Sequence, residues 1–333
     1  MPHKICVIKG DGVGPELIEQ SLRVLEALAL NAVYEEAEAG YACYQKNGSP
    51  IPDATIESCK YNEVVLFSAI TTPPNIPNYK SAIVSIRRAL ELYANIRPMK
   101  TYPGVPCLKE NINFTIFREN TEGEYSGVEG RSGDTAFSMR VITRKASERI
   151  QRKAFDFARA SGKKKVTLIH KANVLRESDG LWREVALGVA KEYASFGIEM
   201  EEVIVDAMAM RLIKEPEKFS IIVAPNLFGD ILSDEAAQLV GGLGMTPSAN
   251  IGDKYALFEP THGSAPKYTG QNVVNPLAQL LSVKMMLEHL GESGRAEKLE
   301  NAIINTLQAG IKTKDIGGTA STSEVVDAII SRL

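Results

Sequence analysis

The chain has 333 residues, of which 44% are hydrophobic, and a net charge of −3. This length exceeds what one hydrophobic core usually serves, so we expect two domains. Charges of both signs are interspersed and no apolar run reaches 18 residues, which argues against a nucleic-acid-binding surface and a membrane span. The four cysteines are widely spaced, and a strand-like pattern rather than a secretory leader begins the chain. We therefore expect free thiols and a cytoplasmic protein.

Short apolar runs alternate with helical patterns along most of the chain. The predicted strands are Ile5–Ile8, Val64–Ser68, Phe114–Phe117, Ser138–Ile142, Val166–His170, Val203–Val205 and Ile221–Ala224. The predicted helices are Pro15 to about Leu30, Ile83–Tyr93, Ser147–Ala160, Gly180–Ser195, Ala207–Ile213, Leu227–Val240, Pro276–Leu290, Ala296–Gln308 and Ser323–Leu333. This alternation predicts an α/β fold with a largely parallel sheet.

Two glycine-bearing segments depart from this alternation. Ser126–Phe137 is polar and flanked by β-prone stretches, which is typical of a hairpin or subunit-contact arm and equally of a solvated loop. The segment from Gly10 to Pro15 lies between a strand and a helix, where the Rossmann dinucleotide fingerprint would lie. Its third glycine comes one position too early and a proline follows, so we do not expect a dinucleotide site of that type.

A pair of carboxylates gives the strongest chemical signal. Asp230 and Asp234 are four residues apart on a helix that follows the apolar run Ile221–Ala224, so they share one helix face. Two like charges there repel unless a cation lies between them, and hard oxygen ligands suit Mg²⁺ or Mn²⁺. Asp206 follows a second strand and could be a third ligand, although in isolation a helix N-cap explains it better.

Basic and proton-transferring side chains form a complementary set. Arg87, Arg97 and Arg118 end predicted strands or helices, and arginine binds carboxylates through its planar fork, although each alone is better explained as an ordinary surface arginine. Tyr125 and Lys171 are candidate proton-transfer groups, and Tyr125 in isolation fits a packed aromatic residue better.

The segment from His262 to Tyr268 is a small glycine- and serine-bearing loop. Such a loop can wrap a nucleotide with its backbone N–H groups, although by itself a simple tight turn explains it better.

Seven ordered motifs run nearly the length of the chain. They are Gly10-Asp-Gly-Val-Gly-Pro-Glu16, Tyr93-Ala-Asn-Ile-Arg97-Pro98, Arg118-Glu-Asn-Thr-Glu-Gly123, His170-Lys-Ala-Asn-Val174, Gly229-Asp-Ile-Leu-Ser-Asp234, Ser248-Ala-Asn-Ile-Gly-Asp253 and Glu259-Pro-Thr-His-Gly-Ser-Ala-Pro266. Together they resemble the isocitrate, 3-isopropylmalate and homoisocitrate dehydrogenase family of metal-dependent β-decarboxylating dehydrogenases.

The resemblance implies a two-domain fold that is not the Rossmann fold. Residues 1–97 with 241–333 would form the large, cofactor-side domain, and residues 98–240 the small domain with the metal ligands and the dimer clasp. The active site would lie in the cleft between the domains and be completed by the second subunit of a homodimer, with the stretch near Ser126–Phe137 as the clasp.

The resemblance also implies a role for each motif. Substrate would be bound by Arg87, Arg97, Arg118, Thr72, Ser81 and Asn173. Asp230, Asp234 and the partner's Asp206 would hold Mg²⁺ or Mn²⁺. Lys171, also acting on the partner's site, would take the hydroxyl proton, and Tyr125 would protonate the enol product. The cofactor would contact His262, Gly263, Ser264, Ala265, Lys267, Tyr268, Val274 and Asn275.

Lys267 and Tyr268 bear on the choice of cofactor. NAD-using members carry Asp directly after His-Gly-Ser-Ala-Pro, where it accepts the ribose hydroxyls, whereas this chain has Lys267 followed by Tyr268. A cation and a phenol suit the 2′-phosphate of NADP, so the resemblance predicts NADP.

The substrate is predicted from the region around Thr72 and Ser81. Both residues resemble isocitrate dehydrogenase, whereas Ile83, where that enzyme usually has Asn, looks more like homoisocitrate dehydrogenase. We expect isocitrate, with homoisocitrate and then 3-isopropylmalate as alternatives. A non-catalytic regulatory subunit is a further alternative, although such subunits tend to lose groups that this chain retains.

Overall fold

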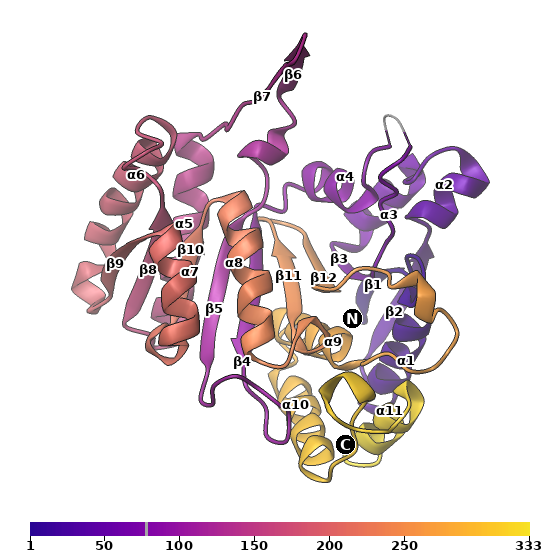
Figure 1. Ribbon diagram of the computed structural model, residues 1–333. Helices are drawn as coiled ribbons and strands as arrows, with labels where there is room; N and C mark the ends of the chain where they lie inside the picture. The colour runs from indigo at the N-terminus through magenta and orange to yellow at the C-terminus, as the bar shows by residue number, and fades with distance from the viewer. Residues whose placement is uncertain (77–78) are drawn as a thin grey trace. The chain divides into compact units, whose positions relative to one another are not determined.

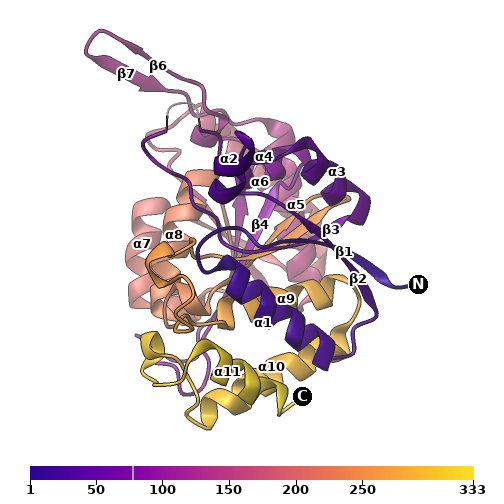
Figure 2. The same cartoon turned by 90° about the vertical axis from the view of Figure 1, so that its right-hand side faces the viewer.

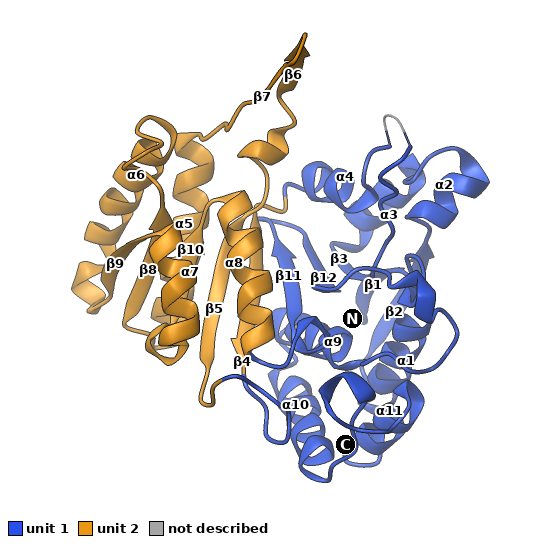
Figure 3. Ribbon diagram, in the orientation of Figure 1, with its two compact units in different colours: residues 1–91, 101–108, 240–333 blue, residues 92–100, 109–239 orange. Residues whose placement is uncertain are grey.

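The computed structural model describes residues 1–76 and 79–333 and divides into two compact units (Figure 3). Unit 1 contains both ends of the chain, and unit 2 contains its middle. Unit 1 comprises Met1–Glu91, Thr101–Leu108 and Val240–Leu333; unit 2 comprises Leu92–Lys100 and Lys109–Leu239. The first boundary lies before residue 97 because strand β4 (Ala94–Lys100) pairs antiparallel with β5 (Asn113–Glu119).

Unit 1 contains strands in the order β2-β1-β3-β12-β11 (Figure 1). Their neighbours pair in parallel except for β11 and β12, which are antiparallel. The strands are β1 (His3–Ile8), β2 (Ala32–Ala37), β3 (Val64–Phe67), β11 (Pro247–Ile251) and β12 (Ala256–Pro260). The helices are α1 (Gly14–Ala27), α2 (Tyr41–Asn47), α3 (Asp53–Asn62), α4 (Ala82–Ala89), α9 (Leu277–His289), α10 (Ser293–Gln308) and α11 (Thr322–Ile330). Helix α9 packs on β11 and β12, and α3 packs on β1 to β3.

Unit 2 contains strands in the order β4-β5-β10-β8-β9, parallel from β5 onward. Besides β4 and β5 they are β8 (Lys165–His170), β9 (Glu199–Ile204) and β10 (Ile221–Ala224). The helices are α5 (Arg144–Ala160), α6 (Ser178–Tyr193), α7 (Val205–Lys214) and α8 (Asn226–Leu239). Helices α5 and α6 pack together on one side of these strands, and α7 and α8 pack together on the other (Figure 1).

The apolar runs that predict strands are the buried centres of the two units. Ile5–Ile8 and Ile221–Ala224 are fully buried, and the second run coincides with β10. Trp182 on α6 is fully buried, and its indole N–H donates to the carbonyl of Ile169 at 3.0 Å. The predicted α/β fold is therefore confirmed.

Three predicted elements differ from the structure. The helix Ile83–Tyr93 ends at Ala89, because the chain turns at Glu91 (φ +49°) to begin β4. The strand predicted over Ser138–Ile142 is wrong beyond Ser138, where hairpin strand β7 (Thr135–Ser138) ends. The strand predicted over Val203–Val205 lies at the end of β9, and Val205 already begins α7.

The polar stretch Ser126–Phe137 contains the two-stranded hairpin of β6 (Glu129–Ser132) and β7. The hairpin extends away from the rest of unit 2 in both views (Figures 1 and 2). The ring of Phe137 lies against Gly130, where a Cβ atom would come within 2.6 Å of it. Val128, Phe137 and Met139 are each about half exposed, so the arm offers apolar side chains to its surroundings.

The four cysteines are free thiols, as expected from their spacing. In the part of the chain that the structure describes, no helix has both the length and the apolar character that crossing a membrane requires.

Candidate functional site

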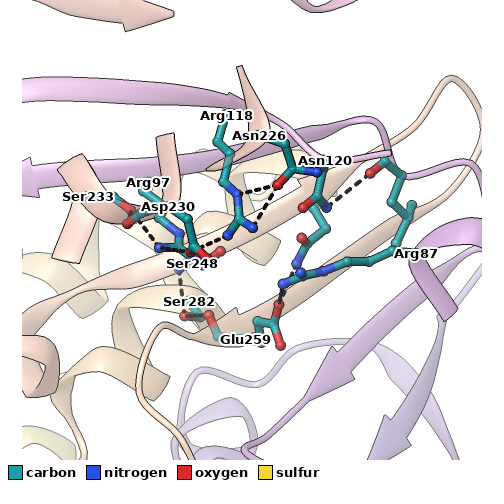
Figure 4. Close-up of polar contacts among 12 residues, drawn as sticks. Arg87, Arg97, Arg118, Asn120, Asn226, Asp230, Ser233, Ser248, Glu259 and Ser282 are labelled. Atoms are coloured by element: carbon teal, nitrogen blue, oxygen red, sulfur yellow. Dashed lines mark hydrogen bonds and ion pairs between the residues drawn. The ribbon is translucent and has the colours of Figure 1, made fainter. Parts of the chain in front are cut away.

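The first turns of α8 hold a cluster of charged groups within unit 2 (Figure 4). Asp230 lies at its centre: one carboxylate oxygen accepts a short hydrogen bond from Nη1 of Arg118, and the other accepts from the hydroxyl of Tyr125 at 2.5 Å. Nε and Nη2 of Arg118 both donate to Oδ1 of Asn226, at 3.0 and 2.8 Å. The structure thus brings together three residues that the sequence predicts separately.

Arg97 reaches the same cluster from strand β4. Its Nη1 donates to Oγ of Ser233 at 2.5 Å and lies 3.4 Å from Asp234 and 3.5 Å from Asp230. The side chain of Arg97 is 7% exposed, whereas that of Asp234 is 59% exposed. Asp234 therefore keeps carboxylate surface for a further ligand.

Gly229 allows α8 to approach β5 closely enough for these contacts. A Cβ atom at this position would lie 2.8 Å from Cβ and 3.3 Å from Cα of Arg118. These atoms cannot swing away as the end of a flexible side chain would, so a larger residue would push α8 away from Arg118.

Two groups of the cluster have shifted ionisation. Burial raises the pKa of the Tyr125 phenol, and its hydrogen bond to Asp230 raises the pKa further. A phenol is protonated at neutral pH without any shift, and this upward shift extends the protonated form to higher pH. Burial also raises the pKa of Asp234, with the Arg97 guanidinium acting in the opposite direction.

Lys171 and Asp206 form a second group in unit 2. Lys171 follows β8, and its Nζ forms a short ion pair with Oδ1 of Asp206. This hydrogen bond holds the pKa of Asp206 below its usual value. Asp206 lies in the first turn of α7, whose N-cap residue is Ile204, so the prediction that Asp206 is the N-cap is wrong.

The three carboxylates expected to bind the metal are Asp230 and Asp234 of one subunit and Asp206 of its partner. Among the described residues, no group of three or more His, Cys, Asp or Glu side chains is arranged to hold a metal ion. Asp230 and Asp234 share one face of α8, and Asp206 is paired with Lys171 instead. Asn173 is exposed in the turn after Lys171.

Arg87 belongs to a charged group in unit 1. Its Nη2 donates to Oε1 of Glu259 at 2.8 Å, and both side chains are nearly buried. Nδ2 of Asn250, on the neighbouring strand β11, donates to the same oxygen at 2.7 Å. Glu259 thus fixes the direction of the Arg87 side chain on α4 (Figure 4).

The predicted cofactor loop also lies in unit 1. Ser264 is buried, its Oγ lies 2.6 Å from Oγ1 of Thr71, and its carbonyl accepts the N–H of Val13 at 3.0 Å. Gly12 is required beside this loop, because its φ is +58° and a Cβ would lie 2.1 Å from that carbonyl oxygen. The loop is therefore held against the turn after β1.

The remaining loop residues differ in exposure. Burial lowers the pKa of His262, and Gly263 is exposed. Ala265 adopts φ +39°, which is rare for a residue with a side chain. Lys267 and Tyr268 are both exposed, with the Lys267 ammonium 4.7 Å from the Tyr268 ring centroid.

Four further predicted residues complete the description of unit 1. Nδ2 of Asn275 donates to Asp315 at 3.0 Å, and the carbonyl of Val274 accepts the hydroxyl of Thr322 at 2.7 Å. Oγ1 of Thr72 donates to Oγ of Ser81 at 3.3 Å, just before α4.

Sequence reasoning missed three residues that orient these groups: Asn226, Glu259 and Asp11. Asp11 is buried and accepts the backbone N–H groups of Tyr41, Ala42 and Thr71 at 2.7 to 2.8 Å. Each lies in a recognised motif or within a few residues of one. Each also lies near the carboxyl end of a strand, which is the signal that could have found them.

The site combines buried arginines, helix carboxylates and a protonated phenol on an α/β fold. That combination is typical of enzymes that act on small carboxylic acids.

The comparisons with known proteins give the family. The family model "Isocitrate/isopropylmalate dehydrogenase" matches residues 4–329. The 3-isopropylmalate dehydrogenase of Methanothermobacter thermautotrophicus is 46% identical, covering 99% of this chain and 98% of that protein. The homoisocitrate dehydrogenase of Methanocaldococcus jannaschii is also 46% identical, covering 98% and 97%. The crystal structure of isocitrate dehydrogenase from Methylococcus capsulatus has a TM-score of 0.96 and 42% identity, covering 99% of both chains.

The chain belongs to the isocitrate/isopropylmalate dehydrogenase family of β-decarboxylating dehydrogenases. Members of this family use a divalent metal and a nicotinamide cofactor, act on small hydroxy acids and are commonly dimers.

Proposed function

We propose that the protein oxidatively decarboxylates isocitrate to 2-oxoglutarate and CO₂, with NADP as oxidant and Mg²⁺ or Mn²⁺ as the metal. The observation that carries the proposal is the cluster of Arg97, Arg118, Tyr125 and Asp230 around the start of α8. It combines carboxylate-binding cations, a proton donor and oxygen ligands within one group of contacts.

The donor set fits a hard divalent cation. Asp230 and Asp234 supply carboxylate oxygens from one helix face, and Asp234 has exposed surface to offer. Asp206 of a second subunit would supply a third carboxylate. When bound, the metal supplies Lewis acidity toward the oxygens of the acid, and NADP supplies the hydride acceptor.

The chain's own residues would then bind the acid and move two protons. Arg97 and Arg118 bind its carboxylates through their guanidinium groups, and Arg87, oriented by Glu259, binds another. Nζ of Lys171 from the second subunit takes the proton of the hydroxyl as the hydride leaves the carbon that bears this hydroxyl. Tyr125, which is protonated at neutral pH, delivers a proton to carbon after CO₂ has left.

The choice of NADP is supported by Lys267 and Tyr268, which are exposed on the cofactor loop. A cation attracts the 2′-phosphate, whereas an aspartate would repel it. We expect kcat/KM to be higher with NADP than with NAD, and Lys267→Asp to reverse this order. Lys298→Asp, on the exposed side of α10, is the matched charge control and should leave the ratio unchanged. A wild-type preference for NAD would contradict this part of the proposal.

The choice of substrate acid needs its own argument, because two relatives that are both 46% identical to this chain are named for different acids. Thr72 and Ser81 offer hydroxyl groups for a third carboxylate, which supports isocitrate, whereas Ile83 supports homoisocitrate. Steady-state rates with isocitrate, homoisocitrate and 3-isopropylmalate measure the order directly. We expect the highest kcat/KM with isocitrate, and a higher value with either other acid would contradict the assignment.

Lys171→Met tests the mechanism and the regulatory-subunit alternative together. It should abolish turnover and leave metal-dependent binding of isocitrate, measured by calorimetry, nearly unchanged. A wild-type chain that binds isocitrate but does not turn over any of the three acids would favour a regulatory subunit instead.

A homodimer with shared sites is supported by two features of unit 2. Asp206 lies apart from the Asp230 cluster in one chain, and Met210, Ile213 and Ile231 on α7 and α8 are each more than half exposed. Mixing Lys171→Met with Asp230→Asn subunits tests the sharing. In a shared-site dimer one site of each hybrid is intact, so random exchange should restore about a quarter of wild-type activity. Sites built from one chain alone would give none.

A further inference from the structure

The root of the β6–β7 hairpin lies beside the candidate proton donor. The N–H of Gly123 donates to the carbonyl of Val141, and that of Met139 donates to Val128, both at 2.8 Å. Tyr125 lies in the short 3-10 helix Glu124–Ser126, between these two hydrogen bonds along the chain. The segment that carries Tyr125 is therefore held in place by the hydrogen bonds that join the two sides of the hairpin at its root.

Arg140 contacts this root from the segment that follows β7. Its Nη1 donates to Oε1 of Glu124 at 2.7 Å, and its guanidinium carbon lies 4.3 Å from the ring centroid of Phe228 on α8. The Arg140 side chain is only 9% exposed. One guanidinium thus contacts the residue before Tyr125 and a residue two positions before Asp230.

Asp179 joins Arg140 to the candidate base. Asp179 is fully buried at the start of α6; its Oδ1 accepts Nε of Arg140 at 3.0 Å, and its Oδ2 accepts the backbone N–H of Lys171 at 2.6 Å. The carboxylate therefore fixes the first residue of the turn after β8. Glu124, Arg140 and Asp179 thus form a chain of ion pairs that begins at the residue before Tyr125 and ends at the backbone N–H of Lys171.

This network differs from the other ion pairs of α5 and α6. Arg144–Glu184 and Arg152–Glu192 are largely exposed and connect only helix surfaces. Burying an ion pair costs desolvation energy that its attraction often fails to recover, so such a pair is weak evidence for stability alone. Its directional contacts do impose one geometry on the groups that they join.

We propose that Arg140 and Asp179 are positioning residues, which hold Tyr125 of one site and the Lys171 that serves the partner's site in a fixed relation to each other and to the root of the hairpin. They contact neither the candidate substrate groups nor the cofactor loop among the described residues. The inference rests on the proposed function, because it takes Lys171 and Tyr125 to be the groups that transfer protons.

Asp179→Asn is the main test. Asparagine keeps the shape, but its amide group faces one of the two N–H donors and cannot accept from it. We expect kcat to fall by about ten- to a hundredfold, since displacements near 1 Å can cost that much. The KM values for isocitrate and NADP should change less than threefold. The deuterium isotope effect on kcat with C2-deuterated isocitrate should rise, because hydride transfer then limits the rate.

Val189→Ala is the matched control for stability. Val189 is buried on the same helix and lies outside the network, so its truncation loosens α6 without moving Lys171. It should leave kcat within about twofold and the isotope effect unchanged. Arg140→Lys serves as a second variant, because lysine keeps the buried positive charge but lacks the planar guanidinium group. It should lower kcat and raise the isotope effect as Asp179→Asn does.

The outcomes separate the inference from the proposed function. An active wild-type enzyme whose Asp179→Asn and Arg140→Lys variants match Val189→Ala in kcat and isotope effect would overturn the positioning role alone. A wild-type enzyme inactive on all three acids would overturn the proposed function, and the positioning role with it. Hydrogen exchange gives an independent readout: the Lys171 amide should exchange faster in Asp179→Asn than in Val189→Ala.

Discussion

Replacing Gly229 by alanine should destabilise unit 2, whereas the same change at Gly188 should stabilise it. Both glycines lie within helices, α8 and α6. At Gly229 the new Cβ would lie 2.8 Å from Cβ of Arg118, whereas at Gly188 it would meet no atom within 4 Å. The two variants therefore differ in one respect, which is the crowding against Arg118.

The magnitudes follow from two effects. Alanine stabilises a helix interior by about 1 kcal/mol relative to glycine, and this gain applies to both variants. Overpacking a buried contact costs roughly 1–3 kcal/mol, and this cost applies to Gly229 alone. We therefore expect Gly188→Ala to raise the free energy of unfolding by about 0.5–1 kcal/mol. Gly229→Ala should then be less stable than Gly188→Ala by roughly 1–3 kcal/mol.

Urea unfolding followed by tryptophan fluorescence measures this difference. Trp182 is the only tryptophan, and it is fully buried in unit 2, where both glycines lie. Its emission therefore reports on the unit that the two changes affect. Equal unfolding midpoints for the two variants would refute the close approach of α8 to Arg118. An unchanged affinity for isocitrate in Gly229→Ala would separately contradict the proposed role of Arg118.

Three further predictions follow from single contacts. Thr143 caps α5 by accepting the N–H of Ala146 at 3.2 Å, and it donates to Glu122 at 2.9 Å, so Thr143→Ala should cost about 1–2 kcal/mol at neutral pH. Burial raises the pKa of Glu122 in the folded protein. The protonated form of Glu122 therefore stabilises the folded state below the pKa that Glu122 has in the unfolded chain. This stabilisation is lost as the pH rises through the pKa in the folded protein. Because the Thr143 bonds favour the carboxylate, the cost of Thr143→Ala in urea titrations should be larger at pH 7 than at pH 4. Ser321 forms a capping box with Glu324, and Ser321→Ala should speed hydrogen exchange in the first turn of α11, consistent with a loss of about 1 kcal/mol. Of the four cysteines only Cys107 is not fully buried, so it should react first with a thiol reagent in the folded protein, and equal rates for all four would contradict the packing.

The elements that sequence patterns predict well are those whose residues are uniformly apolar. Ile221–Ala224 is such a run, and it coincides with β10. Strands β11 and β12 were missed because they bury polar residues, among them Asn250 and Glu259. These two side chains are satisfied by each other and by Arg87, which lies more than 150 residues away in the sequence. A pattern of local hydrophobicity cannot register that compensation.

In the candidate site too, local spacing predicts some contacts, whereas others depend on pairing between segments that are distant in the sequence. Helical spacing alone places Asp230 and Asp234 on one face of α8. The meeting of Arg97 with Arg118 depends instead on strand register: Arg97 lies opposite Ile116, two residues from Arg118, so both arginines point to the same side of the sheet. That register is set by the antiparallel pairing of β4 with β5, which the sequence does not reveal.

Arg118 and Asp230 are each other's partners in the structure, and this pairing bears on how the proposed ligands would bind. An acid that takes Arg118 leaves the Asp230 carboxylate with less positive charge beside it, and a cation that takes Asp230 leaves Arg118 without its counter-charge. Either ligand alone therefore breaks a nearly buried ion pair and leaves one charge poorly compensated, which is costly. Together the two ligands give each charge a new partner, so acid and cation should bind cooperatively, and each must strengthen the other by the same factor. A cation on Asp230 would also compete with the Tyr125 phenol for the carboxylate oxygen to which the phenol donates.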